Sequence, residues 1–152
     1  MFLCKKLFRK VVTIDGEQQE VILATAGESS SGMHFVDWYG SGKEAPIELF
    51  TYAEADFTIL VLRKDGLWEY DAWCRGMKVE DKFYAVGSGA KAALGAMHMG
   101  ADAHKAALIA CKVDPYCALP VLTMSLHAAP AKRSRKKAPI DSQPEKAVES
   151  SS

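Results

Sequence analysis

The fold is decided by the stretch from Phe83 to Met124, FYAVGSGAKAALGAMHMGADAHKAALIACKVDPYCALPVLTM. Its β-forming start predicts a short strand over Lys82–Val86, which Gly87-Ser88-Gly89 ends. Apolar residues at helical spacing then predict a helix that begins at Ala90. The stretch therefore opens with a strand, a tight glycine turn and a helix in direct succession.

The second half of this stretch predicts another helix. Gly100 interrupts the first one, and helical periodicity resumes from about Asp102 to Lys112. Pro115 disfavours helical geometry at Asp114, so the helix should end there. One face of this helix carries small residues that permit close packing against a sheet or another helix: Ala103, Ala106, Ala107, Ala110 and Cys111.

The N-terminal third predicts a β-hairpin followed by a helix. Lys6–Ile14 and Val21–Ala24 are rich in apolar and β-branched residues, and the polar segment between them suggests a hairpin with a longer loop. Three serines at 29–31 are candidate N-caps for a helix that ends near Gly40 and Gly42. The buried face of this helix is predicted to hold Phe35, Val36 and Tyr39.

A second hairpin lies in the middle of the chain. Lys64-Asp65-Gly66 separates the β-forming runs Asp56–Arg63 and Leu67–Trp73, and Asp-Gly between apolar strands is a strong hairpin signal. The order of strands, helix, strands and helix pair predicts an α+β domain with stacked sheets and outer helices.

The segment Gly87–Ala92 matches the dinucleotide fingerprint G-x-G-x-x-G/A. A Rossmann unit would continue into a parallel strand with an acidic residue near its end, whereas a second alanine-rich helix follows here. A simple tight turn with Ser88 as cap is the alternative. We expect no cofactor.

The length and composition of the chain limit the number of domains that it can form. The chain has 152 residues and no formal net charge, so its net field neither attracts nor repels nucleic acid as a whole. We expect one domain over residues 1–127 and a disordered tail over residues 128–152 that is basic, then acidic. Its basic part is an alternative phosphate-binding or nucleic-acid-binding segment: Lys132, Arg133, Arg135, Lys136 and Lys137.

No apolar run is long enough to span a bilayer, so we expect no membrane partner and a cytoplasmic protein. The cysteines and histidines are scattered, without metal-ligand spacing. Free thiols and no metal site are expected from this pattern.

With its glycine turn, alanine-rich helix pair and Asp114-Pro115-Tyr116-Cys117 closure, the chain resembles the proteasome β-subunit and HslV peptidase family over nearly all of Lys5–Thr123. The compact proteasome-like proteins of some bacteriophages are the most similar group. The resemblance implies a four-layer α-β-β-α sandwich of two antiparallel sheets and hydrolysis of peptides by an N-terminal threonine.

The resemblance also implies site residues. Lys6 matches the lysine whose ammonium lowers the proton affinity of the nucleophile; an exposed basic strand end is the alternative. Gly27 matches the glycine whose backbone N–H stabilises the oxyanion, with Thr25 on the specificity-pocket side. A glycine needed for the turn into the helix would explain Gly27 equally. Ser88 matches the serine beside the free α-amino group that carries the proton.

Asp114 and Cys117 match an Asp-x-x-Ser/Thr pair that orders the site. Cys117 departs from this pattern, and so do Ala118-Leu119, where paired glycines are usual. A thiol is a weaker hydrogen-bond partner than a hydroxyl. These departures favour a site less exactly ordered than in the family.

The first residues lack the family's nucleophile. The chain begins Met1-Phe2-Leu3-Cys4, and neither the N-terminal threonine nor the first strand hairpin is present. Two hypotheses follow: a threonine peptidase whose true N-terminus is missing, or a non-catalytic structural or assembly subunit of a phage particle or mixed ring. Family partners would be peptide or unfolded-protein substrates and an unfoldase, in the host cytoplasm if phage-encoded. A missing hairpin would leave a sheet edge open, so we predict a homo-oligomer.

Overall fold

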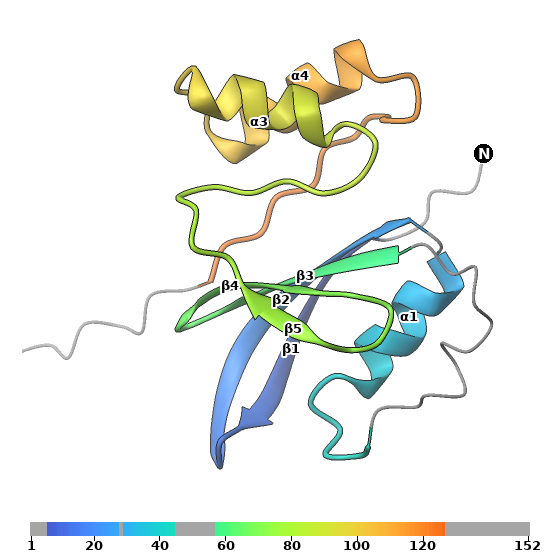
Figure 1. The fold of residues 1–152 in the computed structure, drawn as a ribbon, viewed down its shortest axis with the longest axis vertical. Helices are drawn as coiled ribbons and strands as arrows, with labels where there is room; N and C mark the ends of the chain where they lie inside the picture. The colour runs from blue at the N-terminus through green and yellow to red at the C-terminus, as the bar shows by residue number, and fades with distance from the viewer. Residues whose placement is uncertain (1–5, 28, 45–56, 127–152) are drawn as a thin grey trace, which may run out of the picture.

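A computed structural model describes residues 6–27, 29–44 and 57–126, and within them the strands form one antiparallel sheet in the order β1-β2-β3-β4-β5 (Figure 1). Each strand pairs with its neighbour in the chain, as in a meander. The bounds are β1 (Leu7–Ile14), β2 (Glu17–Gly27), β3 (Phe57–Arg63), β4 (Gly66–Tyr70) and β5 (Gly76–Lys78).

Both predicted hairpins are confirmed, and the first has a shorter turn than predicted. Ile14 pairs with Glu17, so only Asp15 and Gly16 connect the strands, with φ of 51° and 80°. Positive φ at both central residues is the geometry that Asp-Gly favours in a two-residue hairpin. The polar residues after Gly16 therefore belong to β2, at its exposed beginning. In the second hairpin Arg63 pairs with Gly66 across Lys64-Asp65.

The hydrophobic core lies between the sheet and helix α1 (Ser29–Trp38), which covers one sheet face (Figure 1). The predicted helix and its buried face are confirmed, with Phe35 fully buried and Tyr39 only 6% exposed. Lys10 of β1 donates through Nζ to the carbonyls of Val36 (2.5 Å) and Tyr39 (2.9 Å), satisfying acceptors left over at the helix end. The largest fully buried side chains are Phe35, Leu23, Ile59, Val21 and Val61.

The strand predicted over Lys82–Val86 is wrong, and β5 was missed. β4 ends at Tyr70, earlier than predicted, because Asp71 Oδ1 accepts hydrogen bonds from the amides of Trp73 (2.9 Å) and Arg75 (3.0 Å) and turns the chain. The three-residue β5 then takes the place beside β4. Residues 82–86 make no ladder, although Tyr84 stays close to the sheet by donating to Glu69 Oε2 (2.6 Å).

The predicted helix pair is confirmed as α3 (Ala90–His98) and α4 (Ala103–Val113). Asp102 caps α4 by accepting from the Lys105 amide (2.8 Å). Asp114 is extended, with φ −101° and ψ 120°, so the helix ends where Pro115 predicted. The buried residues of this pair are Met97 in α3 and Ala106 and Ala110 in α4.

The helix pair stands apart from the sheet core. Among the described elements α3 and α4 pack on each other, and neither makes an extensive contact with a strand or with α1. Figure 1 shows the segments 79–89 and 114–126 running between this pair and the sheet. The predicted α+β class is confirmed. The predicted tail, residues 128–152, lies outside the described residues, and no described helix is long and apolar enough to cross a membrane.

Candidate functional site

The end of β2 is the point around which the predicted site residues gather. The Thr25 amide donates to the carbonyl of Lys6 (2.9 Å), which continues the β1–β2 ladder beyond Leu7. Lys6 and Thr25 therefore lie directly opposite each other, and strand alternation places both side chains on the face that α1 covers. A Cβ at Gly32 of α1 would lie 3.2 Å from Thr25 Cβ, so the helix approaches this strand end closely.

Gly27 ends β2 with a φ of +89°, a conformation that residues with a side chain rarely adopt. Next to it, Ala26 faces away from α1, and its Cβ lies 3.5 Å from the position that a Cβ on Gly87 would occupy. The Gly87-Ser88-Gly89 turn therefore reaches the strand end from the opposite face to Lys6. The end of β2 thus lies between the lysine and the serine.

Ser88, Asp114 and Cys117 form one hydrogen-bonded group. The Asp114 carboxylate accepts from the Tyr116 amide (2.9 Å) and from the Cys117 thiol (3.5 Å), and the Ser88 hydroxyl lies close enough to stabilise its charge. The Cys117 amide also donates to the Asp114 carbonyl (3.1 Å), so the Asp-x-x-Cys segment is a closed turn. This group links the segment after α4 to the start of α3.

The charges in this group follow from its hydrogen bonds. The Ser88 hydroxyl and then the Tyr116 amide hold the pKa of Asp114 below its usual value, so this carboxylate is ionised at neutral pH. Burial, followed by the hydrogen bond to Asp114, raises the pKa of Cys117. A thiol in that state is a donor and a poor nucleophile. Cys117 is therefore suited to positioning Asp114 rather than to covalent chemistry.

Sequence reasoning missed Gly89, the residue that makes this group compact. A Cβ there would lie 2.6 Å from Cys117 Sγ, closer than such atoms approach, and would contact Ala110 Cβ tightly at 3.0 Å. Gly89 also precedes α3, where unpaired amides favour negative charge, and Asp114 Oδ2 lies 3.6 Å from the same position. The sequence held the signal, since Ala110 lies on the small-residue face already predicted for α4.

The structure thus brings Ser88, Asp114 and Cys117 into direct contact, and Gly27 into the neighbourhood of Gly87. Lys6 approaches from the other face, and its side chain is exposed. The catalytic roles predicted for these residues stay predictions. Within residues 6–27, 29–44 and 57–126, no three His, Cys, Asp or Glu side chains are grouped so that they could hold a metal ion.

Comparison with known proteins supports the fold. No protein-family model matches the sequence, and no curated protein does. Solved structures similar to it include BPH of Thiobacillus denitrificans in complex with epoxomicin, at 18% identity and a TM-score of 0.50, covering 75% of this chain and 87% of that chain. A second BPH structure has the same identity and coverage and a TM-score of 0.49.

HslV from Trypanosoma brucei matches at 19% identity and a TM-score of 0.45, over 74% of this chain and 86% of that chain. At these identities the likeness concerns the fold. The resemblance to proteasome and HslV proteins is confirmed at that level by the first BPH structure.

Proposed function

We propose that this chain is a subunit of a proteasome-like or HslV-like N-terminal-nucleophile peptidase, with peptide-bond hydrolysis as the reaction of the complete site. The observation that supports this proposal most is that the predicted site residues meet at the end of β2. Lys6 pairs with Thr25 on one face, and the Ser88 group reaches Ala26 through Gly87 on the other. The BPH-like fold supports the same proposal.

The proposed chemistry assigns one task to each group. A threonine hydroxyl at the end of β2 would attack the scissile carbonyl, and its proton would pass to the free α-amino group of the same threonine. The Lys6 ammonium would favour the alkoxide by its charge, and the Gly27 N–H would donate to the oxyanion. Ser88, positioned by Asp114 and Cys117, would hold the α-amino group in place.

Thr25 lies near the end of β2 but is inside the chain and has no free α-amino group, so we propose that the described residues are inactive by themselves. The nucleophile would have to come on a segment that begins with threonine and forms strands next to the described sheet. Several apolar side chains are consistent with such an added layer, because they are exposed: Val11 (66%), Leu119 (63%) and Leu122 (59%). This layer would complete the four-layer sandwich between the sheet and the α3–α4 pair.

The experiment is intact mass and N-terminal sequencing of the protein from its native source, followed by hydrolysis of a fluorogenic peptide. A threonine start with activity is expected, and Lys6→Met should then lower kcat/KM by about 10²- to 10⁴-fold. Ser88→Ala should cost up to about 10²-fold, since the amine would be misplaced. Lys91→Met, an exposed lysine on α3, is the matched control and should change nothing. A threonine start without hydrolysis would contradict the proposal.

A non-catalytic assembly subunit is the second candidate, and one observation favours it. Among the described strands β1 is a sheet edge of eight residues with an exposed apolar centre, and such edges invite pairing with another chain. A native start at Met1, no hydrolysis, and a particle heavier than 16.6 kDa in sedimentation would support it. Val11→Lys should then shift the particle toward the monomer, because a charge at the edge opposes strand pairing.

A further inference from the structure

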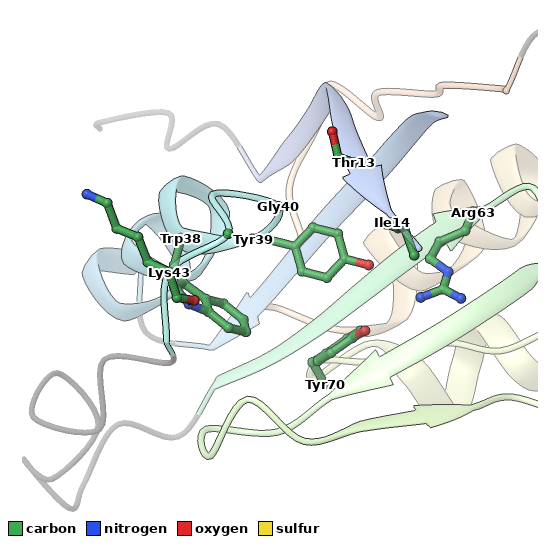
Figure 2. A pocket seen from close by; sticks show the side chains of 9 residues that line it. Thr13, Ile14, Trp38, Tyr39, Gly40, Lys43, Arg63 and Tyr70 are labelled. Atoms are coloured by element: carbon green, nitrogen blue, oxygen red, sulfur yellow. The ribbon is translucent and has the colours of Figure 1, made fainter. Parts of the chain in front are cut away.

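A cavity of about 290 Å³ lies beside the end of β1 that is farther from Lys6 of the candidate site (Figure 2). Thr13 and Ile14, at the end of β1, form part of its wall, whereas Lys6 lies before the beginning of that strand. Its lining comes from four parts of the chain: Thr13, Ile14, Trp38, Tyr39, Gly40, Gly42, Lys43, Arg63 and Tyr70. The proposed peptidase chemistry uses none of these residues.

The walls of the cavity are aromatic and rigidly held. The Tyr39 and Tyr70 rings meet edge to face, with centroids 5.4 Å apart and planes at 79°, and Phe35 of the core stacks on Tyr39 at 5.6 Å. Trp38 Nε1 donates to the carbonyls of Lys43 (3.0 Å) and Glu44 (3.1 Å), which fixes the loop at the rim. Side chains locked in this way form a preorganised surface for a planar ring.

The polar end of the cavity is the Arg63 guanidinium. Asp65 accepts from its Nε (2.8 Å) and Nη2 (2.6 Å), and the guanidinium carbon lies 4.3 Å from the centre of the Trp68 ring. The side chain is only 13% exposed. Asp65 takes two of the five guanidinium hydrogens, and Tyr39 also interacts with the guanidinium, so Arg63 and the two tyrosines form one polar group whose remaining donors a bound anion would share. Figure 2 shows the Tyr39 and Tyr70 hydroxyls pointing toward this end of the cavity.

Charge and protonation make this end a site for an anion. The hydrogen bond that Arg63 donates to Asp65 raises the pKa of Arg63, and burial raises the pKa of Tyr70, so one stays a cation and the other a donor. The lining itself holds no acidic side chain, and Asp65, which pairs with Arg63, lies outside it. Lys43 lines the rim, but Figure 2 shows its ammonium pointing away from Tyr70, which leaves Arg63 as the cation within reach of a bound ring.

We propose that this cavity binds a monocyclic aromatic carboxylate, with its ring between Trp38 and Tyr70 and its carboxylate at Arg63 and the tyrosine hydroxyls. The volume suits this size, since a cavity of roughly 150 Å³ holds benzene and a substituent needs further room. Charged donors and a phenol hydroxyl recognise a carboxylate by short hydrogen bonds. The site is independent of the proposed peptidase function.

The test is a calorimetric titration of the full chain with 4-hydroxybenzoate and with its neutral analogue, 4-hydroxybenzyl alcohol. We expect saturable binding of the acid at millimolar or lower concentration, and about tenfold weaker binding of the alcohol. Arg63→Met should weaken binding of the acid about tenfold or more. Arg75→Met is the matched control, because Arg75 is also paired with an aspartate, Asp71, and does not line the cavity.

Three results would overturn the proposal: no saturable binding of the acid up to about 10 mM, equal affinity for acid and alcohol, or full affinity in a folded Arg63→Met variant. Far-UV circular dichroism reports whether that variant is folded. If it is not, Tyr70→Phe decides, since it removes one hydroxyl and keeps the ring. Tyr70→Phe should weaken binding of the acid about threefold and affect binding of the alcohol less. Equal losses of affinity for both ligands would count against the carboxylate contact.

Discussion

The two halves of the molecule are stabilised in different ways. Between α1 and the sheet, large side chains such as Phe35, Leu23 and Ile59 are completely buried. In the α3–α4 pair the buried residues are mostly small, and hydrogen bonds around Asp114 connect the segments. Burial of large apolar groups supplies most of the stability of a fold, whereas close packing of small residues fixes distances. Most of the stability is therefore located in the sheet half, and the Ser88, Asp114 and Cys117 part of the candidate site in the other half.

The largest effect should come from Phe35→Ala, which disrupts the core between α1 and the sheet, the half that supplies most of the stability. Phe35 is fully buried and contacts Trp38, Tyr39 and Tyr70, so its removal leaves a cavity and should cost about 3–5 kcal/mol of the free energy of unfolding. Urea denaturation measures this loss. Tyr116→Ala is the control, because Tyr116 is 87% exposed and its loss should be nearly neutral. Similar losses in both variants would contradict a core centred on α1.

A glycine pair tests how tightly the same half is packed. Gly40 and Gly42 have nearly equal φ, +75° and +72°, but a Cβ on Gly40 would lie 2.3 Å from Val12 Cγ1 and one on Gly42 would meet nothing within 4 Å. Gly42→Ala should cost about 1–2 kcal/mol from backbone strain alone. Gly40→Ala should cost about 1–3 kcal/mol more from overpacking. Thermal unfolding of both variants gives the difference, and equal losses would mean that Val12 moves aside freely.

A second glycine pair tests the other half. Gly89→Ala should destabilise α3 and α4 by about 1–3 kcal/mol, because its Cβ would collide with Cys117 Sγ. Gly95→Ala, in the same helix with open space around it, should stabilise by about 0.5–1 kcal/mol. Hydrogen exchange by mass spectrometry measures both changes segment by segment. We expect faster exchange in residues 90–113 of Gly89→Ala and unchanged exchange in β2 and β3; loss of protection throughout would indicate that the halves unfold together.

The smallest effect should come from pH, through the thiol that packs on the core. Burial and then the charge of Asp71 raise the pKa of Cys74 to about 11. The fold therefore favours the neutral thiol, and its contribution is complete below the unfolded-state value of 9.0 and is lost as pH rises toward 11. Because Cys74 is half-exposed, the loss should stay below about 1 kcal/mol. Denaturation at pH 8 and pH 10.5 should show less pH dependence for Cys74→Ala than for the parent, and equal slopes would refute the assignment.

Much of the fold could be predicted from the sequence because local signals agree with the tertiary structure. Asp15-Gly16, Asp65-Gly66 and Pro115 each act within a few residues, and each marks a real turn or helix end. The error at Lys82–Val86 has the opposite origin. A strand needs a partner, and the hydrogen bonds of Asp71 redirected the chain so that Gly76–Lys78 took the position beside β4.

The candidate site was predictable where a motif places its residues close together in sequence or in a known fold. Ser88, Asp114 and Cys117 came from such a resemblance, and the structure brings them into contact. Gly89 could have been found from steric reasoning about α4. The cavity around Arg63 could not, because Tyr39 and Tyr70 lie on separate elements and meet only when α1 packs on the sheet.

The chemical reactivity of the Lys10 amine reports whether α1 is packed on the sheet. Its amine is engaged by the carbonyls at the end of α1, whereas the amine of Lys91 lies on an exposed surface. An amine-specific acylating reagent should therefore modify Lys91 at the rate of a free amine and Lys10 only when the helix leaves the sheet. The ratio of the two modification rates would measure how often α1 leaves the sheet in the intact protein without added denaturant. Measured under different solution conditions, it would show how the stability of the contact between α1 and the sheet changes.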